Sequence, residues 1–191
     1  MPSTPRIPTL RGPRVILRPW RQSDRDVFAA MNDDPRVMEF MVKRLARAES
    51  DAMADRIETC FAERGFGLWA VEIPGLADFA GFAGLWPVRP EIPCAPAVEV
   101  GFRLAPIAWG KGYATEGARL ALAHGFEEAE LREIVSFTAA INVRSQRVMQ
   151  KLGLVFSGTF EHPAVPEGNP LRPHVLYRIS AEEWRRSIAP G

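Results

Sequence analysis

The pattern that decides the fold begins with Val98-Glu99-Val100-Gly101-Phe102-Arg103-Leu104 and continues, after a short connector, with Trp109-Gly110-Lys111-Gly112-Tyr113-Ala114-Thr115. In the first stretch apolar side chains alternate with other residues, which predicts a strand with one face in the core. In the second stretch two glycines precede a pattern of helical period that runs to about Ala129. The two stretches therefore predict a strand, a glycine loop and a helix, in that order.

The glycine loop is suited to an anionic ligand at the start of its helix. Glycines permit a sharp bend and a close approach, and the amides of a first helical turn have no partner inside the helix. Together with the helix dipole they favour a phosphate or pyrophosphate. The loop is not a Walker motif, because Lys111 is not followed by Ser or Thr, and Thr115 stands where a dinucleotide fingerprint has its third glycine. An ordinary strand-to-helix turn fits the two glycines equally well.

A stripe of small residues follows on the same helix, formed by Ala114, Gly117, Ala118, Ala121 and Gly125. Their helical spacing lets the helix lie close on a sheet. Since Gly117 inside a helix costs about 0.5–1 kcal/mol relative to Ala, close packing is the benefit that we expect.

A second motif runs from Asn142 to Gly153. Asn142 is predicted to cap the start of a helix and Gly153 to end it in the left-handed conformation. Ser145 lies one turn after Asn142 on a similar face. Its hydroxyl can serve the cap or remain free for chemistry.

The remaining elements follow from residue period and turn residues. Strands are expected at Val15–Trp20, Leu68–Ile73, Phe79–Val88, Ala97–Leu104, Ile134–Ala139, Val155–Phe160 and Val175–Ile179. Helices are expected from a cap at Ser23 or Asp24 to Met31, and over Ala48–Arg64, Asn142–Leu152 and Ala181–Ser187. Strands followed by β-α-β-α-β alternation indicate an α/β (α+β) protein with a mixed sheet and helices on both faces. Residues 1–191 are expected to form a single domain.

Composition excludes several classes of protein. Among 191 residues, 24 Lys and Arg against 23 Asp and Glu leave a net charge of +1, unlike a nucleic-acid binder. Five arginines near the start are interpreted as solvated charges: Arg6, Arg11, Arg14, Arg18 and Arg21. Neither the two cysteines nor the three histidines have metal-site spacing, so no metal is expected. Because no apolar run is long enough to span a membrane, we expect a reduced, soluble, cytoplasmic protein.

Taken together, the two motifs resemble those of the GNAT superfamily of acetyltransferases. Leu104-Ala105-Pro106 followed by the glycine loop is similar to its acetyl-CoA loop, and Asn142-x-x-Ser145-x-x-Val148-Met149-x-Lys151-Leu152-Gly153 is similar to its second motif. The run Trp109–Glu116 and the closing Glu182-Glu183-Trp184 resemble the ribosomal-protein-alanine (Rim-like) branch. The likeness spans residues 14–184 and is sharp over Val98–Leu154. Many members have Gln or Arg in place of Trp109, and Lys111 is expected to compensate in part for that missing cation.

The resemblance implies a largely antiparallel central sheet whose two central strands splay apart, with acetyl-CoA as the cosubstrate. The pantetheine arm would enter the gap beside the backbone of Phe102, Arg103 and Leu104. Asn142 would bind that arm. The pyrophosphate would lie on the amides of the glycine loop, which are those of Gly110, Lys111, Gly112, Tyr113, Ala114 and Thr115.

Two catalytic residues are also expected. An acceptor amine must be neutral to attack a thioester, so a base is needed, and an α-amine with a pKa of about 7.7–8.0 is easier to deprotonate than a lysine. Glu99, which alternates out of the apolar face of its strand, is the candidate base; a solvated or salt-bridged strand carboxylate is the alternative. By resemblance, Ser145 would protonate the departing thiolate.

Three functions remain open at this point. The first is an N-acetyltransferase for a protein or peptide N-terminal α-amine, and the second is one for a small amine such as an antibiotic, a polyamine or an amino acid. The third is a non-catalytic acyl-CoA-binding domain. The expected partner is an amine acceptor, without nucleic acid or membrane, and the sequence is compatible with a homodimer. The walls of the acceptor site are expected around Val37–Met41, Trp86 and Glu161–Pro173.

Overall fold

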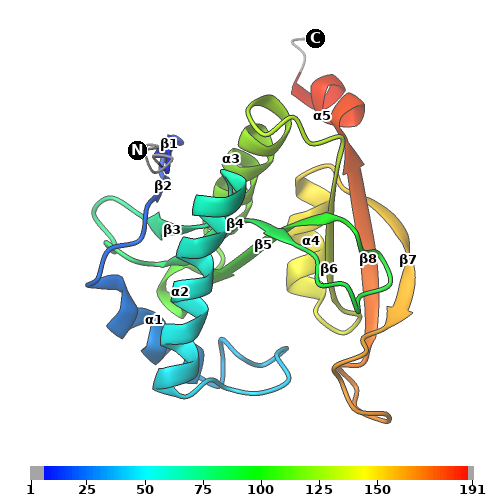
Figure 1. Ribbon diagram of the computed structural model, residues 1–191, viewed down its shortest axis with the longest axis horizontal. Helices are drawn as coiled ribbons and strands as arrows, with labels where there is room; N and C mark the ends of the chain where they lie inside the picture. Colours follow the sequence, from blue (N-terminus) through cyan, green and yellow to red (C-terminus); the bar gives the residue numbers. More distant parts are fainter. Residues whose placement is uncertain (1–6, 189–191) are drawn as a thin grey trace.

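Eight strands form one sheet in the computed structural model of the protein, which describes residues 7–188 (Figure 1). The strands are β1 (Leu10–Arg11), β2 (Ile16–Arg18), β3 (Leu68–Glu72), β4 (Gly81–Pro87), β5 (Val98–Leu104), β6 (Glu133–Ala139), β7 (Val155–Glu161) and β8 (Pro173–Ser180). The helices are α1 (Asp24–Asp33), α2 (Arg47–Arg64), the short 3₁₀ helix η1 (Pro106–Ala108), α3 (Tyr113–Glu127), α4 (Val143–Lys151) and α5 (Ala181–Ile188). Their order along the chain confirms the predicted mixed α/β architecture.

The sheet is antiparallel except at its centre. Its order is β1-β2-β3-β4-β5-β6-β8-β7, and only β5 and β6 run parallel. β4 and β5 pair at seven positions, as do β6 and β8, whereas β5 and β6 pair at a single position, Glu99 with Val135. The two central strands therefore splay apart beyond Glu99, as the sequence predicted, and divide the molecule into two halves (Figure 1).

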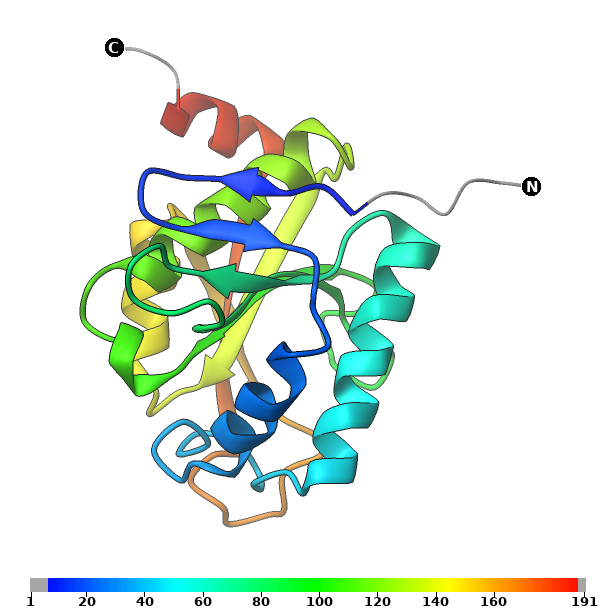
Figure 2. The ribbon, with the colours of Figure 1, turned by 90° about the vertical axis from the view of Figure 1, so that its left-hand side faces the viewer.

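Helices cover both faces of this sheet. Figure 2 shows α2 on one side and α3 with α4 on the other. The small-residue stripe of α3 lies against the sheet, because a Cβ on Gly117 would be 3.3 Å from Ala83 and one on Gly125 would be 2.8 Å from Ile134. Since Ala118 and Ala121 are fully buried, the stripe fixes the start of α3 close to the end of β5.

On the opposite face, α1 packs on β4 through aromatic side chains, since Phe28 contacts the ring of Phe82 edge-on. Phe61, near the end of α2, contacts Trp69 of β3 in the same manner, and the Trp69 ring also lies against His124 of α3. At the end of α1, the fully buried Asn32 donates a hydrogen bond to the Ser50 hydroxyl of α2 at 2.9 Å. This bond ties the two helices together beneath the loop that connects them.

The interpretation of the early arginines as solvated charges is wrong for Arg18. Its side chain is 4% exposed and donates two hydrogen bonds to Asp24 and one to Glu72. Ser23 stands at the N-cap of α1 as expected but makes no side-chain cap bond, and the Asp24 carboxylate is held by Arg18 and by the Arg21 amide. Of the other four arginines, Arg6 lies outside the described residues.

Two short elements were not predicted. β1 has only two residues and is held by pairing with β2, which sequence period cannot reveal. The connector Ala105–Trp109 contains η1, which begins with Pro106. No helix among residues 7–188 combines the length and the apolar character needed to cross a bilayer.

A substitution at Gly84 in β4 tests how closely β4 packs against the chain around β3. A Cβ added there would lie 2.1 Å from the carbonyl oxygen of Gly67, whereas one added to its β5 partner, Gly101, would meet nothing nearer than 3.9 Å. We expect Gly84→Ala to lower the free energy of unfolding by about 3 kcal/mol or more, because backbone atoms must move. The matched control Gly101→Ala should change it by no more than about 1 kcal/mol. Urea denaturation of both variants measures the difference, and equal stabilities would contradict the packing described.

Candidate active site

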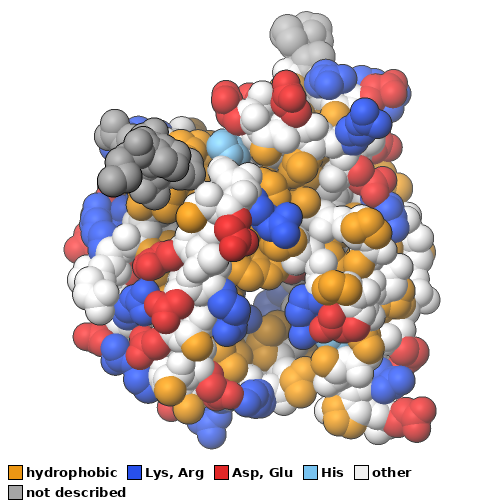
Figure 3. All heavy atoms as spheres, viewed as in Figure 1, with side chains coloured by type: hydrophobic (Ala, Val, Ile, Leu, Met, Phe, Trp, Pro, Cys, Tyr) orange, Lys and Arg blue, Asp and Glu red, His pale blue; other side chains and the backbone are white. Residues whose placement is uncertain are grey.

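A large cavity of about 820 Å³ opens where β5 and β6 diverge. In Figure 3 it appears as a hollow between α2 and the half that contains β6–β8, with Lys and Arg side chains at its rim and deeper inside. The cavity brings together eleven of the twelve residues selected from the sequence: Glu99, Phe102, Arg103, Leu104, Gly110, Gly112, Tyr113, Ala114, Thr115, Asn142 and Ser145. Residues from three separate parts of the chain thus share one site.

The glycine loop presents a row of unpaired amides to the cavity. Gly110 and Gly112 adopt positive φ values of 73° and 84°, which glycine tolerates without strain. The first backbone bond of α3 runs from the Glu116 amide to the Gly112 carbonyl at 3.0 Å. Within the described part of the chain, no acceptor receives a hydrogen bond from the amides of residues 110–115. Six consecutive free N–H groups at a helix start are chemically suited to an anion.

Lys111 is the exception among the predicted residues. It does not line the cavity, and its Nζ donates to the Ile107 carbonyl at 3.3 Å. The Lys111 carbonyl accepts a hydrogen bond from Arg14 at 3.0 Å, and Arg14 pairs with Glu116 of α3 at 2.8 Å. Lys111 thus braces the loop through its backbone, and the expectation that its charge compensates for Trp109 is not supported.

Trp109 has a structural role and contacts a cation other than Lys111, namely Arg144. Its indole N–H donates to the Leu104 carbonyl at 2.7 Å, which fastens the loop to the end of β5. The guanidinium of Arg144 lies over the Trp109 ring, 5.2 Å from its centre, and over the Phe40 ring at 5.4 Å. Arg144 also pairs with Glu39. Arg144, from α4, therefore supplies a positive charge beside the glycine loop.

Asn142 caps α4 as predicted. Its side-chain oxygen accepts from the Ser145 amide at 3.2 Å, and its amide nitrogen donates to the Thr138 hydroxyl at 3.0 Å. These bonds orient Asn142 and leave part of its amide facing the cavity. The Ser145 hydroxyl also lines the cavity and forms no hydrogen bond with the described residues, so it is free to donate to a ligand.

Glu99 stands at the last paired position before the strands separate. Its carboxylate lines the cavity, and neither an ion pair nor a side-chain hydrogen bond joins it to any residue from 7 to 188. Burial raises the pKa of Glu99 to about 7, and the nearby charge of Arg89 partly opposes that rise. A carboxyl group with this pKa can accept or release a proton near neutral pH.

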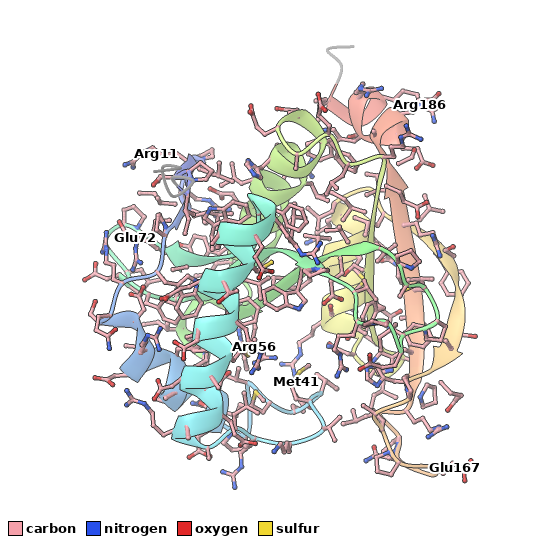
Figure 4. The ribbon with its side chains drawn as sticks, in the orientation of Figure 1. Arg11, Met41, Arg56, Glu72, Glu167 and Arg186 are labelled. Carbon is pink, nitrogen blue, oxygen red and sulfur yellow. The ribbon has the colours of Figure 1, made fainter. Side chains whose placement is uncertain are left out.

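The far side of the cavity has the walls predicted from the sequence. Val37, Met41, Trp86 and parts of the 161–173 loop line it. Figure 4 shows Met41 and Arg56 at the opening beside α2. A cation at this mouth was not anticipated, because Arg56 is one of several arginines on α2 and only the fold selects it.

A pair of histidines was also missed. The rings of His162 and His174 lie 4.7 Å apart in the cavity wall. Burial lowers the pKa of both imidazoles, and His174 further lowers the pKa of His162. The His162 Nδ1 accepts from the Ala164 amide, while the His174 Nδ1–H donates to the Arg172 carbonyl, so each Nε2 is left without a partner among the described residues. Twelve positions separate the two residues, and no sequence pattern links them.

The described residues contain no group of three or more His, Cys, Asp or Glu side chains that could hold a metal ion. Cys60 and Cys94 are both free thiols. Burial raises the pKa of each thiol, so at neutral pH neither is an activated nucleophile.

The raised pKa of Glu99 has a consequence for stability. A carboxyl whose folded pKa, about 7, exceeds its ordinary value of 4.5 stabilises the folded state below pH 4.5, and this contribution is lost as the pH rises through about 7. As the pH rises from 5 to 7.5, we expect the Tm of Glu99→Gln to increase relative to that of the wild type. The increase should be about 2–4 °C for each kcal/mol by which the ionisation of Glu99 destabilises the folded wild type. Differential scanning fluorimetry across this range measures the gap. Glu167→Gln, on the exposed 161–173 loop (Figure 4), is the control, and a gap that stays constant with pH for Glu99→Gln would contradict the assignment.

Comparisons with known proteins agree with this geometry. Residues 14–155 match the family described as "Acetyltransferase (GNAT) domain". The FsC-acetyl coenzyme A-N(2)-transacetylase of Aspergillus fumigatus is 33% identical over 96% of this chain and 81% of its own length. An acetyltransferase (GNAT family) from Bacillus anthracis has a similar structure, with a TM-score of 0.75 at 23% identity over 92% of this chain and 99% of that one.

A second solved structure is Mycobacterium smegmatis RimJ in complex with CoA-disulfide, with a TM-score of 0.71 at 22% identity over 92% of this chain and 87% of that one. At these identities the solved structures establish the fold alone. The family match covers most of the chain, from β2 to the start of β7, and includes every residue of the glycine loop. The protein therefore belongs to the GNAT acetyltransferase family and is an acetyltransferase.

Proposed function

We propose that the protein transfers the acetyl group of acetyl-CoA to the primary amine of a small acceptor molecule. One observation carries the proposal: the glycine loop with its free amides, at Gly110 and residues 112–115, lines the same cavity as the unpaired carboxylate of Glu99. The amides suit the pyrophosphate of the cosubstrate, and the carboxylate suits the amine.

The cosubstrate arm fits the gap between β5 and β6. Beyond Glu99 the two strands no longer pair, so the edge of β5 at residues 102–104 faces open space instead of a neighbouring strand. The amide groups of a pantetheine arm can pair with such an edge as another strand would. Arg147 and Lys151 of α4 line the same side of the cavity and add positive charge for the phosphates.

The transfer proceeds by direct attack. The neutral amine nitrogen attacks the thioester carbonyl carbon, forming the C–N bond as the C–S bond breaks. The nitrogen loses its proton to Glu99, directly or through water, and the thiolate takes a proton from Ser145. The products are an N-acetyl amide and free CoA, and the proton taken up by Glu99 returns through solvent to Ser145, so that atoms and charges balance and both side chains are restored.

The acceptor has two candidate classes. The Rim-like character of residues 109–116 supports a protein or peptide N-terminal α-amine. The Aspergillus relative, named for transfer to N(2) of FsC, supports a different acceptor, and its 33% identity over nearly the whole chain is a closer likeness than RimJ's 22%. The walls formed by Met41, Trp86 and the 161–173 loop also suit a small molecule. We therefore place the small amine first and the peptide terminus second.

Thiol release measured with a panel of amines and N-terminal peptides tests this proposal. Acetyl-CoA consumption that depends on an amine, with an acetylated product seen by mass spectrometry, is the expected result. A higher kcat/KM for peptides than for any small amine would favour the second class. Binding of acetyl-CoA without acetylation of any acceptor would overturn the proposal in favour of a non-catalytic domain.

Gly110 and Gly75 provide a matched test of the phosphate site. Both have φ values near 75°, and a Cβ on either would meet no protein atom within 4 Å. Gly110→Ala and Gly75→Ala should therefore lose similar amounts of stability. Only Gly110→Ala places a methyl group where the pyrophosphate would lie, so we expect its affinity for CoA to fall about tenfold or more. Calorimetry measures both variants, and equal CoA affinities would place the phosphates elsewhere.

Glu99→Gln and Ser145→Ala should both slow chemistry and differ in their pH dependence. Loss of a general base costs about 10²–10⁴-fold in rate, mainly in kcat, while acetyl-CoA affinity stays within a few fold. The wild-type rate should rise with pH through about 7 as Glu99 ionises, and this rise should vanish in Glu99→Gln only. Single-turnover measurements from pH 5.5 to 9 distinguish the two. An unchanged profile in Glu99→Gln would assign the base to another group, and an unchanged rate in Ser145→Ala would remove its role.

A further inference from the structure

Arg103 lies in the cavity wall and is held by neutral partners alone. Its Nη1 donates to the side-chain oxygen of Asn32 at 2.9 Å, and its Nη2 lies 3.2 Å from the sulfur of Met41. Its guanidinium covers the ring of Phe82 at 5.3 Å. Within residues 7–188, no carboxylate lies within ion-pair distance of Arg103. The charge is thus left without a counter-ion inside the protein.

The energetic setting of Arg103 is unusual for an arginine. Burial lowers its pKa to about 10, so at neutral pH it still carries its full charge. The Arg103 guanidinium is half-buried, and a charge withdrawn from water without an acid partner is costly. Asn32 cannot neutralise that charge, and its amide is held in orientation by Ser50. The remaining N–H donors of the guanidinium are available to the cavity, and an anion there would satisfy them.

Arg103 and Glu99 share one face of β5. They are four residues apart, which places their side chains on the same side of the strand with the Cα atoms about 13 Å apart. Gly101 stands between them and presents no side chain, so the wall between the two charged groups is open. A molecule whose amine lies at Glu99 can therefore extend along the strand to Arg103.

A second unpaired cation stands at the mouth of this space. Arg56 of α2 lines the cavity (Figure 4). It has neither an ion pair nor a hydrogen bond to any of the described residues. By contrast, Arg36 and Arg89, which also line the cavity, are paired with Asp34 and Glu91. Among the lining residues of the described chain, Glu99 is the single acid. The acceptor side thus carries an excess of positive charge.

We propose that the acceptor amine also bears an anionic group, in the first instance a carboxylate, and that this group binds Arg103 with Arg56 as a second cation at the entrance. This inference rests on the proposed function and specifies its acceptor. A planar guanidinium matches a carboxylate with two parallel hydrogen bonds. A simple alkylamine would leave the enclosed charge unpaired and should bind less well.

Pairs of amines that differ only by a carboxylate test the inference. Suitable pairs are phenylalanine with phenethylamine, ornithine with putrescine, lysine with cadaverine, and 4-aminobutanoate with propylamine. The wild-type kcat/KM should favour the acid in at least one pair by about tenfold or more. In Arg103→Gln this preference should fall to about two- to threefold or less. Each preference is the ratio of the kcat/KM values for the two amines of one pair. When the same pair is compared between the wild type and a variant, the difference in basicity between its two amines cancels.

Further variants isolate the charge. Arg103→Lys keeps it without the planar fork and should retain more preference than Arg103→Gln. If Arg103→Gln fails to bind CoA in calorimetry, Arg103→Met replaces it, since it removes the charge and keeps an apolar contact with Phe82. Arg25→Gln, which removes an arginine paired with Asp55 and Glu58 outside the cavity, is the control and should leave the preference unchanged.

The outcomes separate the two proposals. If the wild type acetylates no amine, the proposed function fails. If it acetylates amines but prefers neither a carboxylate nor a phosphate in any pair, or if Arg103→Gln keeps the full preference, the anion site is overturned while the function stands. Phosphoethanolamine against ethanolamine forms a separate arm, and a preference there that depends on Arg103, without one for any carboxylate, would assign the anion as a phosphate.

Discussion

The arrangement depends on one feature of the sheet: β5 and β6 pair at a single position, Glu99 with Val135, and then separate. Just beyond that point the Ser136 hydroxyl donates to the Val100 carbonyl at 2.9 Å, which is the last polar link between the two strands. Backbone groups inside a protein need hydrogen-bond partners, and the diverging edges cannot supply them to each other. The fold therefore creates a slot whose backbone groups remain available to a ligand, and the site forms around it.

A slot between two half-sheets keeps its width only if other contacts hold the halves. On the cofactor side Arg119 of α3 donates to the Lys151 carbonyl of α4 at 2.9 Å, and Arg144 of α4 lies over Trp109, which is itself bonded to β5. Glu116 receives the amides of Arg14 and Val15 at 2.7 and 3.0 Å, so the β1–β2 turn supports the glycine loop from behind. These links are polar and lie outside the hydrophobic core. They fix the free amides of the loop relative to Glu99, as pre-organised binding requires.

Local patterns and the family resemblance were sufficient to predict most of the fold and most of the chosen residues that line the cavity. Alternation at 98–104, the glycines at 110 and 112 and the Asn142 cap are each determined by neighbours within a few residues. The failures involve contacts between distant segments. Arg18 is buried because Glu72, 54 positions away, meets it, and Lys111 turns away because the Ile107 carbonyl is within reach. The rings of His162 and His174 lie close together only because the 161–173 loop returns to β8. Charge and residue type alone could not separate these cases from solvated side chains.

The same strand explains why two opposite charges can persist in one wall without neutralising each other. In an extended strand, residues four apart share a face but keep their Cα atoms about 13 Å apart, too far for Glu99 and Arg103 to form a direct bond. If they met, an internal ion pair would lower the pKa of Glu99 and occupy the donors of Arg103. Both would then be lost to chemistry and binding. Gly101 keeps the space between them clear, so the separation that prevents their pairing is also the length over which a bound molecule can contact both. A strand with alternating side chains can thus carry a proton acceptor and a positive charge on one face, far enough apart that neither neutralises the other.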